Sequence, residues 1–331
     1  MALNFKLAAV AALLAGAISI QAAYYPMWLT PVNAEDVGVQ LMQNAGNNLA
    51  SWKATLSKLR FNIENYPESP NRWWYAAQLA DGLYEINELE PAITWYKVLE
   101  NLPDSTTMAK LPGMENAEAA HTTGRLGLAR CYVQLGDTIN AVKYINAILP
   151  RHDADRVMLA ELQFQLNRRN AALKLLQETE GVNITDNALK LRMVQMYRAM
   201  KMYPAANQLL TSVVNSTGNS PADVAMRKQA KDLLRFAQFP HSTNWADGRF
   251  EGTAETADGK LTLEVTIKNG GIERITYQSK PTRTPWSAYE SMTRRIIRDK
   301  YLVVDPVIGA EETCGAIQTA LFMALNKARR N

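Results

Sequence analysis

The chain has 331 residues, of which 47% are hydrophobic and 21% are charged, and its net charge at pH 7 is +4. That length favours two domains over one, and the composition is that of a folded globular protein. The small net charge and the lack of a long block of like charges argue against nucleic acid as a partner.

Residues 1–22 have the layout of a secretory signal peptide. Lys6 precedes an apolar run of fourteen residues, and Ala22 offers a small residue before a cleavage point at Ala23. A bilayer needs roughly 20 apolar residues, so the run is short for a membrane span, but an uncleaved anchor stays open. No cysteine follows the run, which argues against a lipoprotein. We therefore expect an exported protein, periplasmic or associated with the cell envelope.

Residues 34–239 are expected to form a helical array built from repeated helix pairs. In each pair a small residue on the first helix precedes an alanine on the second, and a large apolar residue follows one turn later. Small residues let two antiparallel helices approach closely, while the large ones fill the groove beside them. The four small-residue pairs are Ala80 and Ala92, Ala129 and Ala141, Ala160 and Ala172, and Val194 and Ala206.

The spacing of the second-helix alanines is close to the period of about 34 residues found in tetratricopeptide repeats, which this stretch resembles. An earlier helix is expected within 37–66, an inserted loop at 104–121 and a closing helix at 221–237. Such an array is either a scaffold or a concave surface that binds a peptide or a partner protein, and both interpretations stay open.

The array shows no catalytic constellation. His121 and His152 lack a cysteine or carboxylate at metal-ligand spacing, and His241 falls in the linker, so no metal site is predicted. Cys131 and Cys314 fall in different candidate domains, which favours two buried thiols over a disulfide, although a bridge stays possible. Four aromatic side chains are expected in the core: Trp73, Trp74, Trp95 and Tyr96.

A linker at 240–246 leads to a region of different pattern at 247–331. Apolar and polar residues alternate in two runs, with a turn at 268–271 between them. Helices are expected at 287–301 and 316–328. The pattern predicts an α+β domain with a small antiparallel sheet backed by helices. One face of the first strand is expected to hold Leu261, Leu263, Val265 and Ile267, and the return strand to hold Ile272, Ile275 and Tyr277.

Four segments of this region, DGRFEGTAE, LTLEVTIKNGGIERI, TRTPWS and VVDPVIGAEETCGAIQTALFMAL, follow one another in order between Asp247 and Ala328. Together they resemble the FMN-binding domain family, which includes the flavin-carrying subunits of sodium-pumping NADH:quinone reductases and of Rnf-type complexes. The resemblance implies an FMN site built from Thr284, Pro285, Asp305, Gly309, Ala310, Glu311, Thr313 and Cys314.

The motif departs from the family at the residue that should carry the flavin. In covalent members a threonine after Gly-Ala receives FMN through a phosphoester bond, and here that position is Glu311, which has no hydroxyl. Ile308 replaces a serine or threonine, and Cys314 replaces a serine. Thr313 is a poor substitute acceptor, because a residue two positions further along a helix points in a different direction. Covalent attachment of the usual kind is therefore excluded.

Non-covalent FMN stays open. Gly309 and Ala310 allow a close backbone approach, and free N–H groups at the next helix could meet a phosphate. Glu311 and Glu312 suit the helix dipole but would repel that phosphate. Nearby cations could compensate, and Trp286 or Tyr289 could stack on the flavin ring. The candidate cations are Arg283, Arg294, Arg295 and Arg298.

The sequence thus predicts a multidomain protein: an all-α tetratricopeptide-like array followed by a small α+β FMN-binding-type domain. The resemblance implies non-covalent FMN and an accessory role in extracytoplasmic electron transfer, with the array docking a protein partner such as a membrane redox complex. A carrier or binding module is expected rather than an enzyme. The alternative is a scaffold or assembly module of an envelope complex that keeps the fold without the flavin.

Overall fold

The computed structural model describes residues 25–26, 29, 49–108, 111, 114–181, 184–234, 245–281, 286–299 and 310–329. The expected signal peptide and most of the expected linker lie outside these residues. The chain divides into two compact units, with the break in the helical region after Leu149. Each unit is described by itself.

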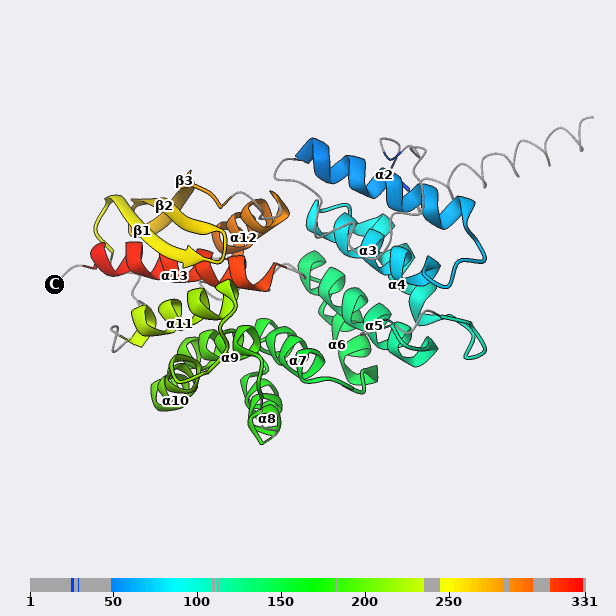
Figure 1. The fold of residues 1–331 in the computed structure, drawn as a ribbon, viewed down its shortest axis with the longest axis horizontal. Coiled ribbons are helices and arrows are strands. Elements are labelled where there is room, and N and C mark those ends of the chain that lie inside the picture. Colours follow the sequence, from blue (N-terminus) through cyan, green and yellow to red (C-terminus); the bar gives the residue numbers. More distant parts are fainter. Residues whose placement is uncertain are drawn as a thin grey trace, which may run out of the picture. The chain divides into compact units, whose positions relative to one another are not determined.

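The described chain is mostly helical, with one small antiparallel sheet near its C-terminal end (Figure 1). This confirms the coarse fold expected from the sequence. The first unit holds α2 (Leu49–Asn65), α3 (Arg72–Glu85), α4 (Leu89–Glu100), α5 (Ala117–Leu135) and α6 (Thr138–Ala147). The second begins with α7 (Asp153–Gln165), α8 (Arg169–Glu180), α9 (Asn187–Ala199), α10 (Tyr203–Val214) and α11 (Pro221–Leu234), and continues with β1 (Gly248–Thr256), β2 (Gly259–Lys268), β3 (Gly271–Ser279), α12 (Trp286–Asp299) and α13 (Glu311–Lys327).

The helix pairs repeat in detail at the turn between their two helices. A residue in the left-handed conformation occupies the same place in four turns, with φ of 69° at Asn87, 75° at Gly136, 61° at Asn167 and 60° at Lys201. In each turn the next residue donates its N–H to a carbonyl five residues back, as Asp137 does to Tyr132 at 2.9 Å. Glycine fills this position in one turn, and asparagine or lysine fills it in the other three.

The small residues predicted at the helix crossings are fully buried. Each of the seven alanines and Val194 has an exposed fraction of 0%. Between α4 and α5 the approach depends on glycine instead. A Cβ at Gly127 would lie 2.2 Å from the Tyr96 ring, and one at Gly124 would lie 2.6 Å from the Tyr96 carbonyl oxygen. Trp95 and Tyr96 are buried as expected, whereas Trp73 and Trp74 are only half-buried.

Two expected boundaries are moved by local capping and by packing. α5 begins at Ala117, inside the expected loop at 104–121, because the Asn116 side chain accepts a hydrogen bond from the Ala119 N–H at 2.9 Å. The last helix begins at Glu311 rather than at 316. At the other end of the array, α11 starts at Pro221, as expected.

The sheet has the order β1-β2-β3 with antiparallel pairing throughout. Asn269 and Gly270 both have positive φ, 54° and 71°, and form the expected turn. Leu261, Leu263, Val265 and Ile267 are buried on one face, which confirms the predicted alternation. The return strand is less regular, because the pairing with β2 shifts twice and Glu273 is passed over between Ile272 and Arg274.

Helix α13 lies between this sheet and the helical array (Figure 1). One side packs on β1 and β2, where a Cβ at Gly252 would lie 1.8 Å from the Ala320 carbonyl oxygen. Its other side packs on α9 and α11, and Phe322 belongs to the same buried cluster as Tyr197 and Leu233 of those helices. A helix that is apolar nearly all round is expected to be enclosed in this way. The sheet and the end of the array therefore share one helix.

Candidate functional site

The structure places four of the eight predicted site residues. Ala310, Glu311, Thr313 and Cys314 come together at the start of α13. The remaining four, Thr284, Pro285, Asp305 and Gly309, lie outside the described residues, and so does the side chain of Glu311.

The start of α13 presents backbone donors behind an N-cap residue that cannot cap them with its own side chain. Ala310 occupies the N-cap position, with φ −131° and ψ 27°, and makes no capping hydrogen bond through its side chain. The first intrahelical bond runs from the Cys314 N–H to the Ala310 carbonyl at 2.9 Å. Backbone N–H groups before that bond have no intrahelical acceptor, and the helix dipole makes this end attractive to an anion.

The side chains of Thr313 and Cys314 point into the protein rather than toward solvent. Thr313 is 8% exposed and Cys314 is 1% exposed, and Cys314 belongs to the buried cluster under the sheet. A phosphoester acceptor must meet the incoming phosphate at the surface, so this burial argues against covalent flavin at either residue. Neither cysteine forms a disulfide and both are buried, as the sequence interpretation favoured.

Glu312 has a role that the sequence did not reveal. Its carboxylate accepts a hydrogen bond from the N–H of Ala257, in the turn between β1 and β2, at 2.6 Å. Burial raises the pKa of Glu312, and the nearby charge of Asp258 raises it further against the lowering by the Ala257 hydrogen bond. From the sequence, Glu312 was expected to repel the phosphate with its negative charge. In the structure its carboxylate is hydrogen-bonded to the turn between β1 and β2.

Tyr289 is part of the core and not an open stacking platform. It is 1% exposed and meets Tyr277 edge to face, with ring centroids 4.8 Å apart. The Tyr277 hydroxyl lies 2.9 Å from the hydroxyl of Thr293, and burial raises the pKa of Tyr277. Lys280 lies over both rings. A flavin ring could not stack on Tyr289 without displacing this packing, so that expectation is corrected.

The arginines expected to balance the acidic pair have different surroundings. Arg295 is 2% exposed within the small α+β part, while Arg294 is half-buried. Arg295 is therefore a buried residue of this part rather than a surface cation. Arg283 and the side chain of Arg298 lie outside the described residues.

A second polar cluster, which sequence reasoning missed, lies in the first unit. The Arg130 guanidinium is 1% exposed, pairs with Asp81 at 3.5 Å and Glu85 at 3.3 Å, and lies over the Tyr84 ring at 4.2 Å. Tyr96 donates its hydroxyl proton to Asp81. These groups satisfy one another across α3, α4 and α5, which is the behaviour of a structural network.

Comparison with protein-family models, with curated proteins and with solved structures finds no match to this chain. Within the described residues, no three histidine, cysteine or acidic side chains are grouped so that they could hold a metal ion. No described helix has both the length and the apolar character needed to cross a membrane.

Proposed function

We propose that this chain is an exported FMN-binding-type protein that holds FMN without a covalent bond. The flavin phosphate is received by the backbone at the start of α13, and the protein serves as an accessory in extracytoplasmic electron transfer. The tetratricopeptide-like array docks a protein partner, such as a membrane redox complex. When bound, FMN would supply the electron-carrying group, and the chain's own residues would bind and orient it.

The observation that carries the proposal is the start of α13 behind Ala310, an N-cap residue whose own side chain cannot accept from the first backbone N–H groups. Most helices in this chain that begin after Asp or Asn use that side chain as a cap, as Asp137 does by accepting from the Asn140 N–H at 3.0 Å. Ala310 leaves the corresponding donors to another acceptor. The Glu312 carboxylate accepts the Ala257 N–H of the β1–β2 turn, so this group is held by the turn.

The test is a titration of FMN into the purified full chain, with binding monitored by the quenching of flavin fluorescence. Riboflavin is titrated in the same way as the matched ligand. Riboflavin lacks the phosphate. If the start of α13 binds the phosphate, FMN should therefore bind at least about tenfold more tightly than riboflavin. Ala310→Asp would place a carboxylate on the same donors. We expect it to weaken FMN and leave riboflavin unchanged, without lowering the unfolding temperature.

Asp137→Ala is the control, because it removes an N-cap on a helix of the first unit. It should lower stability by about 1 kcal/mol and leave FMN affinity unchanged. Equal affinities for FMN and riboflavin would show that the start of α13 does not bind the flavin phosphate. A chain that binds neither would overturn the proposal as a whole.

A second candidate function is favoured by the burial of α13. Phe322 is 1% exposed and lies in the core of the array, so the α+β part also covers the last helices of the array. A protein that uses its C-terminal part in this way could be a scaffold or assembly module of an envelope complex without flavin. The binding experiment separates the two, since the scaffold predicts no affinity for FMN.

A further inference from the structure

The last helix of the array reaches the start of α13 through one buried side chain, Gln229 of α11. Gln229 is 1% exposed and donates its side-chain N–H to the Glu255 carbonyl, near the end of β1, at 2.9 Å. Its side-chain oxygen lies where a Cβ on Gly315 of α13 would come within 3.3 Å. Gln229 thus contacts the end of β1 and the first turns of α13 together.

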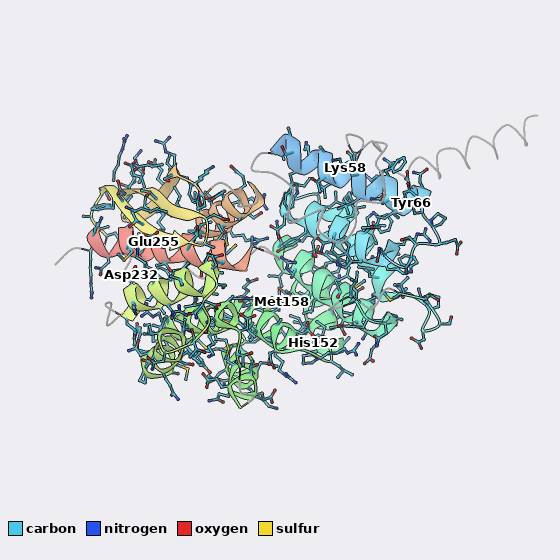
Figure 2. All side chains as sticks on the ribbon, in the orientation of Figure 1. Lys58, Tyr66, His152, Met158, Asp232 and Glu255 are labelled. Carbon is cyan, nitrogen blue, oxygen red and sulfur yellow. The ribbon has the colours of Figure 1, made fainter. Side chains whose placement is uncertain are left out.

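The same end of the hairpin is held from the other side by Glu312. Its carboxylate accepts the Ala257 N–H at 2.6 Å, two residues beyond Glu255. The turn between these anchors is closed by its own bond, from the Thr256 hydroxyl to the Gly259 carbonyl at 2.9 Å. Lys228 also forms a surface ion pair with Glu255 of β1, at 2.6 Å. Figure 2 labels Glu255.

The three buried or half-buried hydrogen bonds outweigh the ion pair. Lys228 is 55% exposed, and exposed ion pairs of this kind contribute little to stability because water screens them. Removing one partner of a buried hydrogen bond costs more, because it leaves the other polar group unsatisfied. The turn is therefore fixed mainly by Gln229 on the array side and by Glu312 on the α13 side.

We propose that residues 255–259, named here the turn latch, link the last helix of the array to the first turn of α13. Gln229 and Glu312 are its positioning residues. This inference rests on the proposed function for its consequence: a partner that moves α11 changes FMN affinity at α13, and FMN changes the order of α11. Such coupling must be equal in both directions.

The experiment measures hydrogen exchange of the full chain by mass spectrometry, with no ligand. The readout is the segment that contains the Cys314 amide, whose N–H makes the first bond of α13. Gln229→Leu keeps the bulk and removes the donor, and it should speed exchange there by about threefold or more. Lys231→Leu is the matched control, because Lys231 is exposed on the same helix, and it should leave that segment unchanged.

Two further variants keep the test decisive if Gln229→Leu folds poorly. Gly315→Ala disturbs the same contact from the α13 side and should speed exchange at 255–259 and in α11. Glu312→Ala removes the acceptor of the Ala257 N–H. In the double variant with Gln229→Leu, the change in exchange rate should differ from the product of the changes in the two single variants, because both substitutions act through one turn.

The latch is overturned if Gln229→Leu and Gly315→Ala speed exchange only within their own helices. If FMN binds, the latch also predicts that FMN slows exchange around Gln229 and that Glu312→Ala abolishes this slowing. If the wild-type chain binds no FMN, the proposed function fails, while the exchange measurements without ligand still decide whether the latch exists.

Discussion

Lys201 occupies a left-handed backbone position that the other helix pairs give to glycine or asparagine. Its φ is 60°, and a side chain with a Cβ that is not Asn or Asp costs about 1–2 kcal/mol there. Lys201→Gly should therefore raise the free energy of unfolding by about 0.5–1 kcal/mol, after the extra entropy of an unfolded glycine is subtracted. Urea unfolding followed by circular dichroism measures the change.

The matched controls are Asn167→Gly and Gly136→Ala in the equivalent turns. The first should be nearly neutral and the second should destabilise by about 1 kcal/mol. A loss of stability in Lys201→Gly would show that the lysine side chain contributes more than its backbone strain costs.

The two cysteines should be unreactive in the folded protein. Cys131 is 0% exposed and Cys314 is 1% exposed, and burial raises the pKa of the Cys131 thiol well above its ordinary value. Because the thiolate is the reactive form, a thiol reagent should label neither residue in native buffer and both in denaturant. Rapid labelling of Cys314 in native protein would contradict the burial of the first turn of α13.

Glu312 makes stability depend on pH. Because its pKa in the fold is raised above the ordinary value of 4.5, protonated Glu312 contributes stability that is fully present below that value. This contribution is lost as the pH rises through the raised pKa. Glu312→Gln stays neutral and can still accept from the Ala257 N–H, so it should raise the unfolding temperature at pH 7 and change it little at pH 4.

Glu290→Gln is the control for that experiment, because Glu290 is exposed on α12. It should change the unfolding temperature equally little at both pH values. A lower stability of Glu312→Gln at pH 7 would contradict this expectation. It would mean that the ionised carboxylate gains more from its hydrogen bond with the Ala257 N–H than its burial costs.

At the scale of elements, the contact between β1 and α13 has no room for a side chain. A Cβ on Gly252 would lie 1.8 Å from the Ala320 carbonyl oxygen and 2.7 Å from the Ala324 nitrogen, both backbone atoms. Gly252→Ala should therefore cost about 3 kcal/mol or more, since neither backbone can yield cheaply. Gly271→Ala is the control, with its nearest atom at 3.8 Å, and should cost far less in the same urea unfolding experiment.

The elements most open to prediction were those set by local pattern. The alternation from Leu261 to Ile267 and the Asn269-Gly270 turn carry their own signals within a few residues, so strand and turn were correctly placed. The irregular pairing around Glu273 and the glycine at 252 depend on partners far away in the chain. No local pattern contains that information.

The candidate site was predictable only in part, for a related reason. The motif brought Ala310, Glu311, Thr313 and Cys314 to one helix start, because neighbours in sequence stay neighbours in a helix. Their orientation was not predictable: Cys314 lies in the buried cluster that holds the sheet residues, and Thr313 is buried beside it. Glu312 accepts a hydrogen bond from the turn between β1 and β2, because Ala257, 55 residues earlier in the chain, lies beside it.

At the scale of the whole molecule, α13 joins two cores within the second unit. Phe322 packs with α9 and α11, while Ala320 and Ala324 pack under the sheet. Phe322→Ala should destabilise by about 3–5 kcal/mol and speed hydrogen exchange in α9 and α11 as well as in α13. Met323→Ala, at a half-exposed neighbour, is the control. Unchanged exchange in α9 and α11 would show that the two cores unfold separately.

Domain organisation is the level at which sequence patterns were least informative. The change from helical to alternating pattern near 240–246 is visible in the sequence, and Trp245 and Ala246 already pair with the end of α13 at Arg329 and Ala328. The division of the described contacts, however, falls after Leu149. Periodicity shows where helices form, but the partner that buries Phe322 appears only in the folded chain.

The central claim is that this chain holds FMN without a covalent bond, and an absorbance scan of the purified protein tests it most directly. The protein is taken from the periplasmic or envelope fraction of cells that make it, then precipitated with acid. The account predicts a flavin spectrum before precipitation and the same flavin released into the supernatant afterwards. Flavin that stays in the pellet, or no flavin before or after addition of FMN, would contradict it.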